Sequence, residues 1–158
     1  MGKQKQLIKQ VVEKLRTDTG GADRLVELTK HRANRIRIGR NFAPRKDNTP
    51  YLGVSITAST PINENATFIQ TARLRFNVYA RTELTAFDIA DRIEVLLDDE
   101  SGTNKSYYDF SGSLVGEVST RSSRLKERSE PELDNDTEVW NIFVEADVIW
   151  ASSPCPTP

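Results

Sequence analysis

The sequence predicts an α+β fold, in which an antiparallel β-sheet of about five strands packs against helices in a single domain. Two segments, residues 3–17 and 83–98, repeat their apolar side chains at helical spacing. Polar, turn-forming segments join most of the strands, which favours hairpins and therefore antiparallel pairing. Apolar and polar side chains alternate, as in half-buried strands, over residues 34–38, 51–57, 67–81, 114–121 and 138–150.

Each long predicted helix carries one apolar stripe. Gly20 and Gly21 end the first helix, and a shorter helix follows with Asp23 near its start. Thr82 is a candidate N-cap for the helix over residues 83–98. The stripe of the first helix consists of Leu7, Ile8, Val11, Val12 and Leu15. The stripe of the later helix consists of Phe87, Ile89, Ala90, Ile93, Leu96 and Leu97.

The inward-facing positions of the strands and helices define the expected core. In the strand over residues 67–81, Arg73, Arg75, Asn77 and Tyr79 face outward. The inward-facing residues of this strand are Ala72, Leu74, Phe76, Val78 and Ala80. Residues 41–50 and 101–106 are predicted loops, and residues 59–66 form a hairpin tip. Residues 122–137 are a highly charged connection between the last two strands. We expect a shared core that contains Phe76, Val78, Phe87, Ile93, Trp140 and Ile142.

A chain of 158 residues has the length of one domain. We assign residues 1–151 to this domain, and residues 152–158, which contain three prolines, to a flexible tail. No apolar run approaches the roughly 20 residues that a membrane helix needs, and the N-terminus lacks the apolar region of a secretory signal. We therefore expect a protein made in the cytoplasm, without a membrane partner.

Composition argues against several functional classes. Basic residues number 22 and acidic residues 23, whereas a general nucleic-acid binder is usually strongly basic. A single cysteine, Cys155, excludes an internal disulfide framework and a multi-cysteine zinc site. A single histidine, His31, excludes a histidine-rich metal centre. The eight glycines are scattered and form no phosphate-binding loop.

Two short motifs lack the context that their chemistry needs. Residues 134–138 begin like a calcium loop and Glu145 takes its twelfth position, but Val139 stands at the sixth position, where the turn needs Gly. Ser123 and Lys126 form a Ser-x-x-Lys pair in a predicted polar loop, without the motifs that accompany it in enzymes. We therefore expect no enzymatic activity and no catalytic, cofactor-binding or metal-binding residues.

Charges of opposite sign are segregated along the chain. Residues 30–46 contain seven Lys or Arg and no acid, whereas residues 88–100 and 127–138 each contain six acids and one Arg. These segments are either solvated surfaces or the two sides of a head-to-tail contact between copies, which generates rings or filaments. In such a contact, charge would set the register and apolar side chains the affinity. The candidate interface residues are Arg35, Arg37, Arg40, Arg45, Lys46, Glu127, Glu130, Glu132, Asp134 and Asp136.

Several short segments resemble a known family. Pro50, Tyr51 and Leu52 open one strand, and residues 75–81 (Arg-Phe-Asn-Val-Tyr-Ala-Arg) form another. A helix follows at once and contains Ala86, residues 89–93, Leu96 and Leu97. With the N-terminal helix, this pattern over residues 3–150 is similar to the tail completion or tail terminator proteins of long-tailed bacteriophages. Residues 32–45 and 122–137 are not part of it.

The resemblance implies an α+β subunit that forms a hexameric ring on the last ring of the tail tube, in the neck of the virion. Such a ring stops tube growth and joins the tail to the head-side connector. The implied partners are other copies of the chain, the tail tube protein and the connector proteins, and genome DNA passes through the ring without specific binding. The family has no catalytic residues.

Three other interpretations compete with this one. A tail tube or head-closure protein is the nearest alternative, although a tube protein favours a large apolar hairpin, and the tip at residues 60–65 is polar except for Ile62. A nucleic-acid-binding module using residues 30–46 needs interleaved aromatic side chains, and Phe42 is the only one there. An enzyme lacks any plausible constellation of residues.

Overall fold

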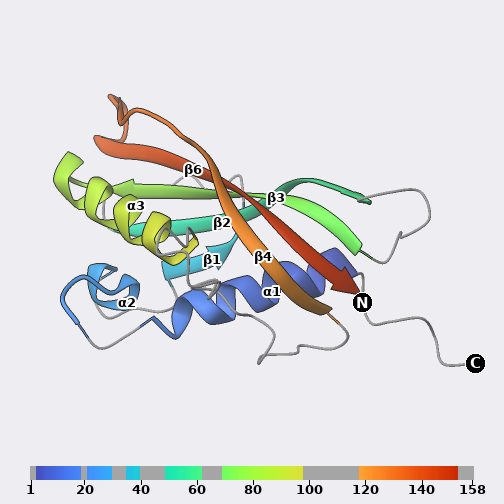
Figure 1. Ribbon diagram of the computed structural model, residues 1–158. Helices are drawn as coiled ribbons and strands as arrows, with labels where there is room; N and C mark the ends of the chain where they lie inside the picture. The colour runs from blue at the N-terminus through green and yellow to red at the C-terminus, as the bar shows by residue number, and fades with distance from the viewer. Residues whose placement is uncertain are drawn as a thin grey trace, which may run out of the picture.

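In the part of the chain that the structure describes, one mixed sheet combines with three helices (Figure 1). Helices α1 (Lys3–Arg16) and α3 (Glu83–Leu97) are the long ones, and α2 (Leu25–Leu28) is a single short turn between them. The α+β class predicted from the sequence is confirmed, with six strands rather than about five. The computed structural model describes residues 3–18, 21–29, 35–39, 49–61, 69–97 and 118–152.

The strands follow the order β1-β2-β3-β6-β4, with β5 also paired to β6. All neighbouring strands are antiparallel except β1 and β2, which are parallel, so the purely antiparallel prediction is wrong for this pair. The connection of about a dozen residues after β1 is long enough to return the chain to the same end of the sheet. The strands are β1 (Ile36–Ile38), β2 (Tyr51–Pro61), β3 (Ile69–Ala80), β4 (Val118–Arg128), β5 (Glu132–Asp134) and β6 (Val139–Ser152).

The cross-strand register gives the sheet one apolar and one polar face. On one rung, Leu52 pairs with Val78 and Val78 with Ile142, and all three side chains are buried beneath α1 and α3. On the next rung but one, Val54, Phe76 and Val144 repeat the pattern. The expected core is confirmed for Phe76, Val78, Ile93 and Ile142, whereas Phe87 and Trp140 are partly buried at its margin.

The predicted ends of the two long helices agree closely with the structure. All five members of the first predicted stripe are buried along α1. At the start of α3, the backbone N–H of Thr85 donates to Oγ1 of Thr82 at 3.2 Å, which confirms the predicted N-cap. None of the helices in the described ranges has the length and apolar character of a membrane span.

The charged connection over residues 122–137 is instead largely β-structure, so its prediction as a connection is wrong. Strand β4 extends to Arg128, and β5 follows within the same segment. The pattern hides these strands because β-bulges between Thr120 and Ser122 and between Leu125 and Glu127 break the alternation. The predicted hairpin tip is wrong for residues 59–61, which belong to β2. Residues 40–48, 62–68, 98–117 and 153–158, with the parts of the predicted loops, hairpin tip and tail that fall on them, lie outside the described residues.

Candidate functional site

The basic segment, residues 30–46, and the acidic segment, residues 127–138, contribute strands to opposite edges of the sheet. Strand β1 follows Arg35 at one edge, and β5 lies beside β6 at the other, with β2 and β3 between. The sheet is one hydrogen-bonded element, so the described basic and acidic residues are kept at a fixed separation on its two edges.

At the basic edge, the two described arginines make different contacts. Arg35 Nη1 donates to the carbonyl oxygen of Thr49 at 2.6 Å and lies 3.4 Å from that of Pro50, which ties β1 to the start of β2. Arg37 is exposed, and its guanidinium carbon lies 5.9 Å from the ring centroid of Tyr51. Burial raises the pKa of the Tyr51 hydroxyl, although the charge of Arg37 acts to lower it.

The end of β1 passes very close to β2. Gly39 has φ of +151° and donates its backbone N–H to the carbonyl oxygen of Val54 at 2.9 Å. A Cβ atom at Gly53 would lie 2.8 Å from the Gly39 carbonyl oxygen, so only glycine fits at Gly53. The remaining predicted basic residues, Arg40, Arg45 and Lys46, lie outside the described residues.

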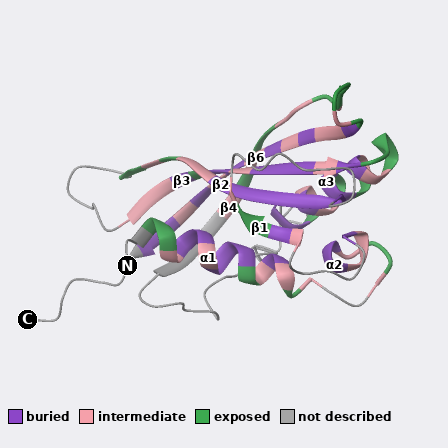
Figure 2. Cartoon of the chain, turned by 180° about the vertical axis from the view of Figure 1, so that it is seen from behind, coloured by how far each residue is buried: buried purple, intermediate pink, exposed green. Residues whose placement is uncertain are grey.

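At the acidic edge, four of the five predicted residues lie together and are exposed (Figure 2). Glu130 precedes β5, Glu132 and Asp134 are its first and last residues, and Asp136 lies in the turn to β6. The turn is closed by the N–H of Glu138, which donates to the Asp134 carbonyl oxygen at 2.7 Å. None of these four carboxylates forms a salt bridge with another described residue, so their charge faces solvent.

Glu127 lies apart from these four residues, on the face of the sheet that the helices leave uncovered. It is level with Glu145 of β6. Beside it, Asp147 accepts a hydrogen bond from Arg73 Nε at 3.0 Å and lies 3.6 Å from Lys126 Nζ, so one carboxylate connects three strands. Glu127 therefore belongs to the charge network of this face rather than to the acidic edge.

Aromatic rings and arginines fill the rest of the uncovered face. The Arg75 guanidinium lies 3.9 Å from the ring centroid of Phe143, and the ring centroids of Tyr51 and Tyr79 are 6.1 Å apart. Arg75 Nε also lies 3.9 Å from a carboxylate oxygen of Glu145. The outward direction predicted for Arg73, Arg75 and Tyr79 is confirmed, and Asn77 shares their face although its side chain is buried. These side chains form cross-strand pairs within the sheet.

In the described part of the second acidic segment, two of the three acids, Asp91 and Glu94, share one arginine. This part lies on α3, where Arg128 Nη1 of β4 lies 2.5 Å from Asp91 and 3.2 Å from Glu94. The Arg128 guanidinium also lies 5.5 Å from the ring centroid of Phe87. These contacts attach β4 to the helix. Among the described acids, Asp91 and Glu94 therefore have a cation partner, whereas the four acids at the β5 edge form no salt bridge with another described residue.

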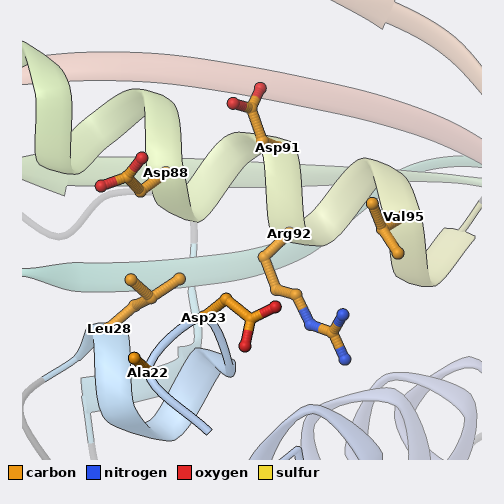
Figure 3. Close-up of a pocket in the computed structure, with 7 residues that line it drawn as sticks. All are labelled: Ala22, Asp23, Leu28, Asp88, Asp91, Arg92 and Val95. Atoms are coloured by element: carbon orange, nitrogen blue, oxygen red, sulfur yellow. The ribbon is translucent and has the colours of Figure 1, made fainter.

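A hollow of about 370 Å³ opens between α3 and the segment around α2 (Figure 3). Arg92 is one of its lining residues, and its guanidinium is held by Asp18, which accepts hydrogen bonds from Arg92 Nε and Nη2 at 2.9 and 2.8 Å. The N–H of Leu25 also donates to Asp18, at 2.8 Å. No nucleophile–base pair occurs among the lining residues, which are Ala22, Asp23, Leu28, Asp88, Asp91, Arg92 and Val95.

The Asp18–Arg92 pair is the main polar contact that sequence analysis missed. Its members are separated by 74 residues, and nothing in the local pattern of either helix links them. Asp18 follows the end of α1 among polar residues, where a solvated carboxylate is the usual expectation. The pair joins the α1–α2 connection to α3, so its function is to fix the helical layer.

The two motifs set aside on sequence grounds have defined places. Residues 134–138 form the end of β5 and a turn, and β6 begins at Val139, in agreement with the predicted strand. Ser123 lies in β4 and donates its hydroxyl to the Leu97 carbonyl oxygen at 2.8 Å, so its prediction as a loop residue is wrong. Among the described residues, no group of His, Cys, Asp and Glu could hold a metal ion. His31 and Cys155 lie outside those residues.

No protein-family model matches the chain, and no curated protein is significantly similar to it.

Proposed function

We propose that the chain is a structural subunit of a bacteriophage virion that assembles head to tail into a ring. The ring caps the tail tube, ends its growth and joins the tail to the head-side connector. It is a hexamer located in the neck, and its partners are the tail tube protein and the connector proteins. The subunit acts through its surfaces and catalyses no reaction.

The observation that carries the proposal is the placement of opposite charges at opposite edges of one sheet. Arg37 marks the β1 edge, and the exposed residues Glu130, Glu132, Asp134 and Asp136 mark the β5 edge. A contact between unlike surfaces repeats from copy to copy, and it closes into a ring when each step adds a constant rotation. The location in the phage tail and the hexameric state are implied by the family resemblance. The geometry of the two edges supports the head-to-tail mode of association.

The first experiment determines the assembly state of the purified chain. Native mass spectrometry and negative-stain microscopy are expected to show a closed ring of six copies. Added to polymerising tail tube protein, the ring is expected to stop growth, so that tubes become shorter as its concentration rises. A monomer at all concentrations would contradict the ring, and an open polymer of this chain alone would favour a tail tube protein.

A charge reversal tests the role of the basic edge. Changing Arg37 and Arg40 to Glu is expected to reduce ring formation on size-exclusion chromatography while circular dichroism shows an unchanged fold. Lys5→Glu combined with Lys9→Glu alters the net charge equally on α1 and serves as the control. Because charge–charge attraction is screened over about 10 Å at 0.1 M salt, assembly of the unmodified chain is expected to slow as salt rises. Normal assembly of the Arg37 and Arg40 variant would show that the basic segment is only a solvated surface.

A further inference from the structure

Four large apolar side chains are notably exposed in the described part of the chain. Leu84 and Val95 lie on α3 and are 76% and 48% exposed. The other two lie at the two edges of the sheet, where Ile38 of β1 is 48% exposed and Leu133 of β5 is 43% exposed. Each edge residue directly follows a charged residue, which is Arg37 before Ile38 and Glu132 before Leu133.

Strand register places the two charged residues on the same face of the sheet. Arg37 pairs with Gly53, whose rung continues through Asn77 to Phe143. Glu132 pairs with Asn141, two residues before Phe143 on β6. Both charged side chains therefore belong to the uncovered face. Their rungs are about 7 Å apart along the strand direction.

The same reasoning places the two apolar residues on the opposite face. Ile38 pairs with Val54, whose side chain points toward the helices. Leu133 pairs with Trp140, which packs at the margin of the same core. Each edge therefore presents an ordered pair, with a charge on the uncovered face and an apolar side chain on the helix-covered face. The two charges are opposite in sign.

We propose that Ile38 of one copy packs against Leu133 of the next copy, while Arg37 of the first pairs with Glu132 of the second. This contact rests on the proposed ring and identifies the apolar centre of its subunit interface. Burial of the two aliphatic side chains supplies affinity, and the ion pair selects the register. The occupant of each edge is therefore a second copy of this chain.

The copies meet through side chains rather than by adding one strand to another. In the parallel pairing, the backbone N–H and C=O groups of Arg37 and Gly39 point toward β2. The backbone polar groups of Ile36 therefore point away from β2, toward the open edge of the sheet. The Ile36 carbonyl oxygen already accepts a hydrogen bond from Arg16 Nε of α1 at 3.0 Å. Because that carbonyl group is occupied and β1 is only three residues long, few backbone groups at this edge can hydrogen-bond to an added strand.

Four serine substitutions test the apolar contact with matched controls. Ile38→Ser and Leu133→Ser are each expected to raise the dissociation constant of assembly about five- to tenfold, measured by analytical ultracentrifugation. Leu84→Ser and Val95→Ser remove apolar side chains of α3 that are at least as exposed, and they are expected to change the dissociation constant less than twofold. Thermal unfolding checks that each variant folds. An edge variant that assembles as well as the α3 controls would overturn the proposal.

Cysteine cross-linking tests which residues meet. In a Cys155→Ser background, Ile38→Cys and Leu133→Cys are prepared as separate proteins and oxidised with copper phenanthroline. Mixing the two is expected to give a disulfide-linked dimer, whereas neither protein alone does, because the contact joins unlike edges. Self-dimerisation of Ile38→Cys would overturn the head-to-tail contact. Formation of rings without the mixed cross-link would overturn this contact but not the proposed ring. A persistent monomer would overturn both the contact and the proposed ring.

Discussion

The ion pair between Asp18 and Arg92 offers the sharpest test of how the helical layer is held. Only 9% of the Asp18 side chain and 11% of the Arg92 side chain are exposed, and two hydrogen bonds join them. Arg92→Leu leaves the carboxylate with the Leu25 N–H and with Arg24, whose Nη1 lies 3.5 Å away. Removing one member of a buried pair typically costs about 3–5 kcal/mol, because the other charge stays buried without compensation. For a chain of this size, that corresponds to a fall in Tm of roughly 6–20 °C.

A double-mutant cycle separates the ion pair from the packing of its side chains. Asp18→Leu and Arg92→Leu are made singly and together, and the free energy of unfolding is measured by urea titration monitored by circular dichroism. The double variant is expected to be more stable than Arg92→Leu alone, because it leaves no unpaired charge. The interaction energy is expected to be about 1–3 kcal/mol. Single substitutions that cost under about 1 kcal/mol and simply add would refute this account.

The same pair predicts a dependence of stability on pH. Burial acts to raise the pKa of Asp18, but the hydrogen bond from Arg92, the Leu25 N–H and the charges of Arg92 and Arg24 outweigh it, so the pKa lies below its ordinary value of 3.8. A carboxylate with a lowered native pKa stabilises the fold above its unfolded pKa, and this contribution is lost as pH falls through the native value. The stability advantage over Asp18→Asn is therefore expected to persist at neutral pH and to shrink below about pH 4. A constant difference down to pH 2 would contradict the assignment.

The remaining predictions concern packing and capping, and urea unfolding measures all three. Phe76→Ala removes a fully buried ring from the centre of the sheet and is expected to cost about 3–5 kcal/mol, so an unchanged midpoint would mean that the assigned face is wrong. Gly53→Ala places a methyl group 2.8 Å from the Gly39 carbonyl oxygen and is expected to cost about 1–3 kcal/mol by displacing β1 from β2. Thr82→Ala removes the N-cap of α3 and is expected to cost about 1 kcal/mol, whereas Thr82→Ser is expected to restore most of it.

Local periodicity was sufficient to predict the elements that bury an apolar stripe. Helices α1 and α3 and strands β3 and β6 each bury regularly spaced apolar residues, so their faces follow from spacing alone. Strand β4 shows the limit of this method. Among its residues with described side chains, Leu125 is the one that packs on the core, and Arg128 fills the next helix-facing position by binding Asp91 and Glu94. Strand β4 forms because it pairs with β6, and such long-range pairing cannot be recognised in the local composition of the segment.

The candidate interface was predictable as charge but not as geometry. Segregation of sign along the chain identified both segments, and sheet order, which depends on contacts between distant residues, placed them at opposite edges. The sequence did not distinguish Arg35, which binds the carbonyl oxygens of Thr49 and Pro50, from the exposed Arg37. It also did not separate Glu127 from the other acids, because a β-bulge decides which face that side chain occupies.

The bulged edge strand β4 has a consequence for behaviour in concentrated solution. An edge strand of 11 residues is long enough to template stacking of further chains into fibrous aggregates. Two bulges interrupt the even spacing of its backbone groups, and Arg124 and Lys126 add exposed positive charge that opposes stacking of identical edges. The chain at high concentration is therefore expected to stay free of fibrous aggregates without a chaperone. Deleting one residue at each bulge would remove this protection and promote fibre formation detectable by thioflavin fluorescence.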